Sequence, residues 1–436
     1  KAVDELKARW QRNAAWYYAS AEERQHKRMR RPLWWGVTSN THDKATALLP
    51  KLLNERLPEL GMDFALMYPT FGLSINLMAG DLQLAAARAY NRMTMDMFKP
   101  YAERFAPVAC IPTRTPKDAL VELDYAVKTL GYRAVMLRGC HERVVPAAEG
   151  VEPQKAVTYS DNIALDSPYD YDPLWQRCVE LQVAVTQHAG SSNWPNHGSI
   201  NNLTYNHIGH FADSNHAFAR GVVLGGVARR FPTLNFGFME GGVSWACQLV
   251  NDMIEHWEKR RRDGLQNPKN TNVAELKDWI QRYGDARTQA ASEAILMNLD
   301  SFRPNCSLDE LSDERHVTDD FDASGVKTKA DIRNVFANQF FYGCEADDRA
   351  TMWAFDPRMG IRLRPIFSSD ITHFDVPDFS DVVPEAYELV EHNCINEQDF
   401  REFTFTNAAL LHTRSNPDFF KGTAVEKAVA DELRLQ

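Results

Sequence analysis

The stretch Val183-Ala-Val-Thr-Gln-His188-Ala-Gly190 decides how the rest of the chain is interpreted. Its β-branched residues alternate, which predicts a short buried strand, and its glycine lets the chain turn sharply where the strand ends. His188 would then stand at the carboxyl end of a strand. A lone histidine can equally be satisfied by a backbone carbonyl in a core, so its role depends on what the other strands carry.

Segments of strand and helix type alternate along most of the chain. Helix signals fall between the apolar runs, as in residues 116–130, which begin with proline and are followed by Gly131. Further strands are expected at 62–68, 105–111, 132–137, 232–239, 336–344 and 363–369. Strands separated by helices at intervals of roughly 30 residues predict parallel βα units. The fold class that best accounts for them is α/β, a (β/α)8 or TIM barrel.

The barrel is expected over residues 41–435, with residues 1–40 as an N-terminal helical extension and Thr41 as the cap of the next helix. Residues 141–172 show little periodicity and predict a loop over the barrel mouth. Residues 252–335 are charged, helical and poor in apolar side chains, so an independent core is not expected there. We expect a helical insertion that closes the barrel and joins subunits.

The composition excludes several classes of protein. The chain has 436 residues, a net charge of −10 and a pI near 5.8, whereas a protein that binds nucleic acid needs a basic face. A membrane span is not expected, because no run reaches the roughly 18 to 20 apolar residues that one needs. Seven scattered cysteines without a CxxC pair predict neither a disulfide framework nor a thiolate zinc site. We expect a cytoplasmic protein.

Three of the expected strands end on side chains that bind metals. They are His188, Glu240 in the run Phe238-Met-Glu240-Gly-Gly242, and Asp370 in the run Ile366-Phe-Ser-Ser-Asp370. The working residues of such barrels lie at the carboxyl ends of the strands. Imidazole and carboxylate together suit zinc, manganese or iron, with a position left open for water or substrate. The alternative is that both carboxylates cap helices or pair with arginines.

Other polar residues near expected strand ends are candidates for binding substrate. Arg138 follows the strand at 132–137 and could face an anionic substrate. His207 and His210 follow the His188 strand and could reach the barrel mouth. The alternative for each histidine is a helix cap or a surface position.

The order of these runs resembles a known family. The runs are Tyr90-Asn-Arg92, Arg104-Phe-Ala-Pro-Val108, Leu130-Gly-Tyr-Arg-Ala-Val135, Val185-Thr-Gln-His188-Ala-Gly190, Arg230-Phe-Pro-Thr-Leu234, Met239-Glu-Gly-Gly-Val-Ser-Trp245 and Ser369-Asp-Ile-Thr-His373. Together they resemble the amidohydrolase-related family, the branch of the metal-dependent amidohydrolase superfamily that includes aminocarboxymuconate-semialdehyde decarboxylase. The resemblance implies a metal inside a (β/α)8 barrel. His188 and Asp370 match its metal ligands, and His373 matches a histidine that supports the site.

The sequence departs from this family pattern in two places. The family opens with a strand that ends in His-x-His or a close acidic variant, and no His-x-His occurs here. We expect that this first strand is missing from the sequence as printed; the alternative is an incomplete metal site. Glu240 stands where the decarboxylase-like members have a catalytic histidine. A glutamate there could act as a general base toward metal-bound water or as a ligand of a second metal.

The sequence therefore predicts a metal-dependent hydrolase that acts on a small organic substrate through metal-activated water. His188, Asp370 and Glu240 are the expected ligands, and Glu240 and Asp370 are also the expected catalytic residues. The expected substrate-binding residues are His207, His210, Arg138 and His373. One or two divalent ions are expected, with zinc favoured over manganese or iron.

Three alternatives stay open at this point. They are a metal-dependent decarboxylase, a dinuclear iron or manganese oxygenase, and a non-catalytic barrel subunit that supports a catalytic partner. The expected partners are a small-molecule substrate and a second copy of the chain in a homodimer or higher oligomer, or else a related barrel subunit.

Overall fold

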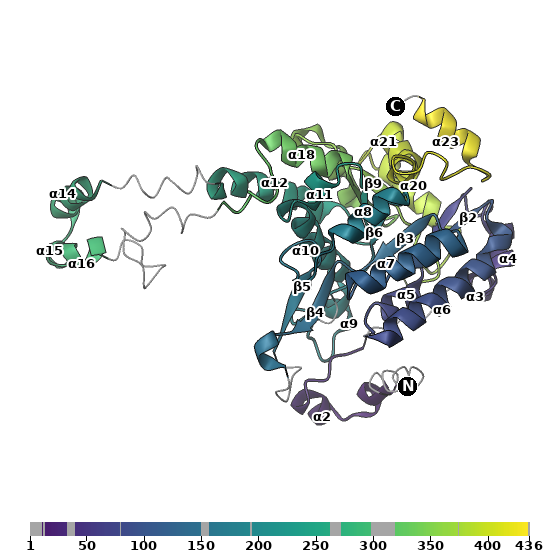
Figure 1. Cartoon of the computed structure of the whole chain (residues 1–436), viewed down its shortest axis with the longest axis horizontal. Helices are drawn as coiled ribbons and strands as arrows, with labels where there is room; N and C mark the ends of the chain where they lie inside the picture. The colour runs from purple at the N-terminus through teal and green to yellow at the C-terminus, as the bar shows by residue number, and fades with distance from the viewer. Residues whose placement is uncertain are drawn as a thin grey trace. The chain divides into compact units, whose positions relative to one another are not determined.

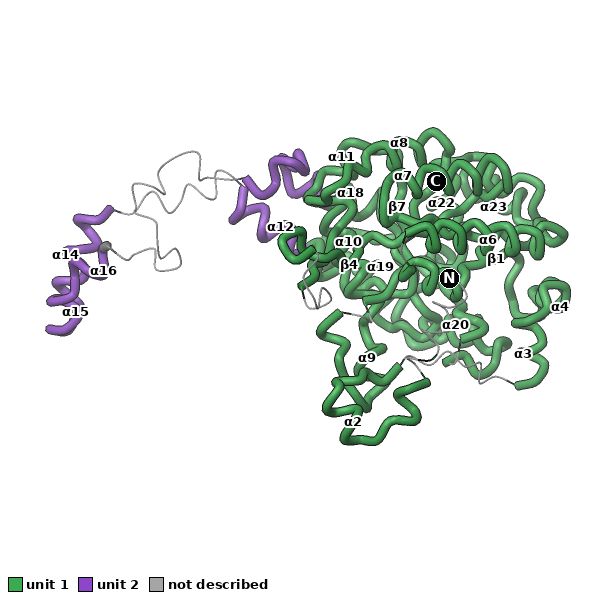
Figure 2. The backbone as a smooth tube through the Cα atoms, turned by 60° about the horizontal axis from the view of Figure 1, so that its bottom comes forward, with its two compact units in different colours: residues 1–250, 333–436 green, residues 251–332 purple. Residues whose placement is uncertain are grey.

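The computed structural model gives the arrangement of most of the chain. It describes residues 11, 14–32, 40–78, 80–149, 157–191, 194–261, 272–297, 319–373 and 375–434. The chain divides into two compact units, residues 1–250 with 333–436, and residues 251–332 (Figure 2).

The first unit is built on one parallel sheet of seven strands. In spatial order the strands are β1 (Ala65–Met67), β2 (Phe105–Cys110), β3 (Ala134–Leu137), β6 (Val185–Gln187), β7 (Phe236–Phe238), β8 (Phe340–Cys344) and β9 (Pro365–Phe367). Every neighbouring pair is parallel, from Ala65 opposite Phe105 to Tyr342 opposite Pro365. Strand order follows chain order without a reversal, as βα units that wind in one direction require.

Helices connect the strands and lie outside the sheet. They are α2 (Ala21–His26), α3 (Thr41–Leu48), α4 (Pro50–Arg56), α5 (Thr70–Ile75), α6 (Asp81–Phe98), α7 (Pro116–Asp124), α8 (Asp172–Glu180), α9 (Leu203–His207), α10 (His210–Leu224), α11 (Val227–Arg230), α12 (Ser244–Arg260), α18 (Lys329–Asn338), α19 (Met352–Phe355), α20 (Val382–Glu391), α21 (Glu397–Arg401), α22 (Asn407–Thr413) and α23 (Glu426–Leu433). Short 3-10 or π-helical turns are η1 (Lys99–Tyr101), η2 (Tyr125–Leu130), η3 (Pro146–Ala148), η7 (Arg349–Thr351), η8 (Pro357–Met359) and η9 (Glu402–Thr406). Helices α6, α7 and α8 lie side by side, and α6 packs on β2 (Figure 1).

The sheet curls so that its inner face closes on an apolar core. Tyr68, just after β1, packs against a cluster that includes Val108 and Met136 of the neighbouring strands. It also packs against a second cluster, which includes Phe341 and Ile366 from the opposite end of the strand order. One side chain can lie against clusters from both ends of the order only if the sheet bends round. This is the α/β, barrel-like arrangement expected from the sequence, with closure by eight strands left as a prediction.

The C-terminal segment packs at the amino ends of the strands. The Arg133 guanidinium, just before β3, donates to the carbonyl of Phe419 at 2.6 Å. The Asn235 amide, just before β7, donates to the carbonyl of Leu411 at 3.2 Å. These contacts cover the amino ends of the strands, so the carboxyl ends are where a substrate would enter.

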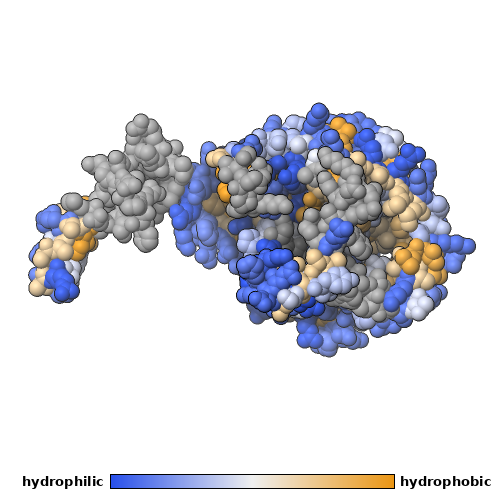
Figure 3. All heavy atoms as spheres, turned by 90° about the horizontal axis from the view of Figure 1, so that it is seen from below, coloured by the Kyte–Doolittle hydropathy of each residue, from blue (hydrophilic) through white to orange (hydrophobic). Residues whose placement is uncertain are grey.

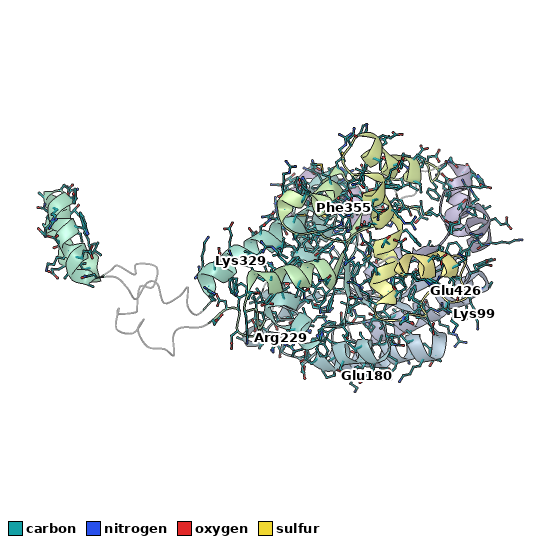
Figure 4. The ribbon with its side chains drawn as sticks, turned by 90° about the horizontal axis from the view of Figure 1, so that it is seen from above. Lys99, Glu180, Arg229, Lys329, Phe355 and Glu426 are labelled. Carbon is teal, nitrogen blue, oxygen red and sulfur yellow. The ribbon has the colours of Figure 1, made fainter. Side chains whose placement is uncertain are left out.

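The surface is polar where the helices face solvent. The face of the molecule seen from below is largely hydrophilic, with scattered hydrophobic groups (Figure 3). Two of the labelled residues, Glu180 at the end of α8 and Lys99 at the start of η1, lie at the periphery (Figure 4). No described helix is both long and apolar enough to cross a membrane, and the six described cysteines are free thiols.

The second unit contains α14 (Val273–Tyr283), α15 (Ala286–Ala290) and α16 (Ser292–Met297). Its limits, Asn251–Ile332, lie within three residues of the tract 252–335 that the sequence set apart. Trp257 is buried, and its indole donates to the carbonyl of Val326 at 3.3 Å within this unit. Whether the unit closes the barrel or joins subunits stays a prediction.

Three sequence-based expectations about local structure are wrong. The tract 141–172 is not only a loop, because β4 (Cys140–Val144) and β5 (Thr158–Asn162) form an antiparallel pair that an Arg143–Asp161 ion pair supports. The cap of α3 is Asn40, not Thr41, because the Asn40 side chain accepts from the Asp43 amide. The sequence also predicts one continuous helix over residues 211–230, but the helix breaks between α10 and α11, where Gly226 takes a φ of 73°.

Candidate metal centre

Three potential ligands meet at the carboxyl edge of the sheet. Glu240 follows β7, Asp370 follows β9, and His373 comes three residues after Asp370. Each offers one ligand atom, and these atoms all lie within 4.8 Å of one another. Among the described residues this is the one such group of three.

His188 joins the group through Glu240. Its Nε2 lies 2.9 Å from Glu240 Oε2, and each side chain is 9% exposed. The imidazole stacks on Tyr68 with ring centroids 5.7 Å apart, and Phe211 meets it edge-on at 5.0 Å. Its Nδ1 is buried and has no hydrogen-bond partner in the described part of the chain. His188 is therefore held by ring packing and by the contact of its Nε2 with Glu240.

The backbone at both carboxylates is in the left-handed region. Glu240 has a φ of 55° and Asp370 a φ of 47°, values that residues with side chains rarely adopt. Such conformations store strain and cluster at functional sites, where the surrounding structure enforces them. Gly343 of β8 makes room, because a Cβ there would lie 3.0 Å from the Glu240 nitrogen. The neighbouring strand thus fixes how Glu240 enters the site.

His373 links the two edges of the sheet. Its Nδ1 lies 2.6 Å from Asp370 Oδ1, and its Nε2 lies 3.0 Å from Thr70 Oγ1, just after β1. Burial works to lower the pKa of His373, but the hydrogen bond and charge of Asp370 outweigh it and raise this pKa to about 9. His373 is therefore protonated near neutral pH, and both of its ring nitrogens donate.

The centre carries more buried negative charge than the protein neutralises. Burial, followed by the charge of Glu240, raises the pKa of Asp370 to about 6. Burial, followed by the charges of Asp370 and Glu240, raises the pKa of Glu345, just after β8, to about 8. Carboxylates that repel one another in a buried site bind a divalent cation well, because the ion supplies the missing positive charge. The donor set of imidazole and carboxylate fits such an ion.

The remaining sequence candidates lie outside this group of three. His210 begins α10 and packs so closely on Gly190 that a Cβ there would lie 2.2 Å from its Nδ1. Burial, followed by the charges of His207, His197 and His188, lowers the pKa of His210 to about 3. The rings of His207 and His210 are 4.9 Å apart. Arg138 follows β3 and is 4% exposed.

Sequence reasoning missed two contributors and treated one as ambiguous. Tyr68 and Thr70 follow β1, the first described strand. Their positions just after a strand could have marked them as candidates for the site. From the sequence, Glu345 could equally cap the helical turn that follows β8, but the cap of η7 is Asp348, whose Oδ1 accepts from the Ala350 amide at 3.0 Å. Glu345 instead lies close enough to Asp370 and Glu240 for their charges to raise its pKa.

Comparison with known proteins agrees with the fold. A dihydroxybenzoic acid decarboxylase from Polaromonas sp. JS666, solved with manganese and 2-nitroresorcinol, is 14% identical, with a TM-score of 0.50 over 88% of this chain and 97% of that one. A 2,6-dihydroxybenzoate decarboxylase from Rhizobium is 17% identical, with a TM-score of 0.48 over 82% and 86%. An amidohydrolase from Mycobacterium avium subsp. paratuberculosis K-10 is 16% identical, with a TM-score of 0.49 over 85% and 75%. At 14% identity the first of these matches supports a shared fold alone.

Comparison of sequences finds one family model. No curated protein matches the chain. The model of the amidohydrolase family matches residues 58–263, which run from before β1 to just past the end of α12 and include His188 and Glu240. The match confirms the resemblance seen in the sequence: over these residues the chain is similar to the amidohydrolase family, which indicates an enzyme.

Proposed function

We propose that the chain is a metal-dependent hydrolase of a small organic substrate. The observation that carries this proposal is the cluster of Glu240, Asp370 and His373, with ligand atoms within 4.8 Å of one another and His188 hydrogen-bonded to Glu240. The cluster lies at the carboxyl ends of parallel strands, where enzymes of this architecture have their active sites.

In this proposal each residue has a separate task. His188 and Asp370 would hold a divalent ion, with Glu240 as a further ligand or as the base. Such an ion polarises a carbonyl and lowers the pKa of a bound water. Glu240 would take the proton of the attacking water, and His373 would hold the Asp370 carboxylate in place through the 2.6 Å contact.

Decarboxylation is the second candidate. The Polaromonas protein with the similar fold is by name a decarboxylase with bound manganese. A protonated side chain beside the metal could deliver a proton to carbon, and His373, charged near neutral pH, is close enough to the cluster for that task. Glu240, by contrast, suits proton removal from water, which favours hydrolysis.

The metal and the reaction can be tested together. Purified protein would be stripped with a chelator, reloaded with Zn²⁺ or Mn²⁺, and assayed for hydrolysis of small esters and amides and for CO₂ release from dihydroxybenzoates. Metal-dependent hydrolysis supports the first candidate, and metal-dependent CO₂ release supports the second. Failure to bind either ion at micromolar concentration would contradict both.

The oligomeric state is a separate proposal. We propose that the chain forms a homodimer, because Trp279 and Tyr283 on α14 are 46% and 79% exposed within one chain. Exposed aromatic side chains on one helix are typical of a subunit contact. Light scattering tests this, and a monomer at micromolar concentration would contradict it.

A further inference from the structure

Asn215 is a polar side chain buried in the interior of α10. The residue is 0% exposed, and its Nδ2 donates to the carbonyl of Met239 at 2.9 Å. Met239 directly follows β7 and directly precedes Glu240. Asparagine is a poor helix former and is mostly exposed in proteins, so helix preference does not explain its position here. The contact with the chain beside Glu240 does explain it.

Hydrogen bonds hold the peptide planes on both sides of Glu240. The bond from Asn215 fixes the plane that joins Met239 to Glu240. Two residues further on, the Gly242 amide donates to the Gly343 carbonyl of β8 at 3.0 Å. Between these planes Glu240 takes a φ of 55°, which costs free energy in a residue with a side chain. The two hydrogen bonds are contacts that offset this cost.

Asn215 reaches this bend from a helix that is itself anchored. A Cβ on Gly241 would lie 2.6 Å from Asn215 Nδ2, so glycine is needed for the amide to come this close. The neighbouring Ser214 is 2% exposed, and its Oγ accepts from Gln187 Nε2 at 3.0 Å. Gln187 is the last residue of β6. Asn215 therefore acts from a fixed support on a chain segment that lies against it.

The bend determines where the Glu240 carboxylate lies. Its Oε2 lies 2.9 Å from His188 Nε2, and it belongs to the cluster with Asp370 and His373. The direction of the Cα–Cβ bond follows the backbone dihedrals, so a φ in the ordinary negative range would point the Glu240 side chain elsewhere. A change at Asn215 can thus move the carboxylate without contacting it.

We propose that Asn215 is a positioning residue, which holds the Glu240 backbone in its left-handed conformation and so keeps the Glu240 carboxylate at the candidate metal centre. Asn215 acts through the Met239 carbonyl. The use of the carboxylate at that centre rests on the proposed function, whereas the effect of Asn215 on the backbone does not.

The test compares Asn215→Ala with a matched control, Asn407→Ala. Asn407 is 1% exposed, and its Nδ2 donates to the Pro365 carbonyl at 2.9 Å. Among the described residues, neither asparagine has a hydrogen-bond partner for its Oδ1. The two side chains differ in place, because Pro365 begins β9 and so lies at the amino end of the strands.

Crystal structures of the two full-length variants measure the backbone directly. In Asn215→Ala we expect a negative φ at Glu240 and loss of its contact with His188, and in Asn407→Ala both should stay as they are. A left-handed Glu240 that still contacts His188 in Asn215→Ala would overturn the proposal, as would the same change in both variants. If the alanine variant does not fold, Asn215→Ser takes its place, because its hydroxyl is too short to reach the same carbonyl.

Mn²⁺ affinity gives a second readout, in solution. If Glu240→Gln weakens Mn²⁺ binding, Asn215→Ala should weaken it by about 10- to 100-fold, as the loss of groups that orient ligands does, and Asn407→Ala should not. The double variant of Glu240→Gln and Asn215→Ala should bind Mn²⁺ as Glu240→Gln does, because Asn215 acts through Glu240. Additive losses, or a loss in Asn215→Ala when Glu240→Gln shows none, would overturn the proposal.

The two readouts separate this proposal from the proposed function. Absence of Mn²⁺ and Zn²⁺ binding by the unmutated protein would contradict the proposed function. The conformation of Glu240 in the crystal structures would still decide the role of Asn215. The Tm of Asn215→Ala and Asn407→Ala should fall by similar amounts, because each loses one buried hydrogen bond. A difference in Mn²⁺ affinity between them therefore does not come from stability.

Discussion

The two halves of the carboxyl edge of the sheet differ in charge. The half formed by the ends of β7, β8 and β9 carries Glu240, Glu345 and Asp370, and the charge of Glu240 helps burial to raise the pKa of the other two carboxyls. The half formed by the end of β3 carries the buried Arg138, whose pKa burial lowers although the charge of Glu142 works to raise it. The difference indicates that a cation belongs beside the carboxylates of the first half.

The largest effect is expected on the acidic half, from Glu240→Gln. This change keeps the size of the side chain and removes the charge, so turnover should fall by about 10²- to 10⁴-fold if Glu240 is the base. The Tm should stay nearly unchanged. Glu142→Gln, an exposed carboxylate on β4, is the control and should retain activity. Full activity in Glu240→Gln, with a large loss of stability, would make Glu240 structural.

Metal content should respond to His188→Ala. Loss of a proposed ligand should lower the affinity for Zn²⁺ or Mn²⁺ by at least about tenfold, because few side chains hold the ion. Elemental analysis after dialysis measures this. His210→Ala is the matched control, because His210 is also buried but, unlike His188, forms no ion pair with a carboxylate of the cluster in the described part of the chain. Equal metal loss in both variants would move the site away from His188.

The pH dependence of stability should report the crowding of carboxylates. The folded pKa of Glu345 is raised to about 8 from an ordinary value of 4.5, so the folded state binds more protons than the unfolded state between these values. In the metal-free protein this stability contribution is complete below pH 4.5 and is lost as the pH rises through 8. Glu345→Gln should flatten the fall of Tm between pH 5 and pH 8. An unchanged slope would remove Glu345 from the acidic half.

The smallest effect is expected where the two sheet edges meet. Thr70→Val removes one hydrogen bond to His373, worth about 1 kcal/mol, and should lower turnover only a few-fold. Thr70→Ser keeps the hydroxyl and should behave as the unmutated protein does. A loss as large as that of Glu240→Gln would mean that His373 takes part in the reaction and does not only position Asp370.

Several features of this protein were determined by local sequence alone. The alternation in 183–187 and in 132–137 predicted β6 and β3, because a strand buried on both faces needs apolar, β-branched residues whatever lies beside it. The carboxyl ends of parallel strands share one edge, so position along the chain was enough to select Glu240, Asp370 and Arg138 as candidates. The family resemblance, carried by the same runs, was confirmed.

The tertiary structure decided how these residues meet. The contact of His373 with Thr70 joins positions 303 residues apart, and it exists only because the sheet curls. The hairpin of β4 and β5 was missed because its mixed polar sequence has no period. These residues become strands only because the two segments pair with each other. The break before α11 falls at Gly226, whose φ is 73°, and the neighbouring Gly225 must be glycine, since a Cβ there would lie 1.9 Å from the Ala164 carbonyl oxygen. Local sequence sets which residues are buried and which can turn, whereas partners distant in the chain set distances and charge, and these decide the chemistry.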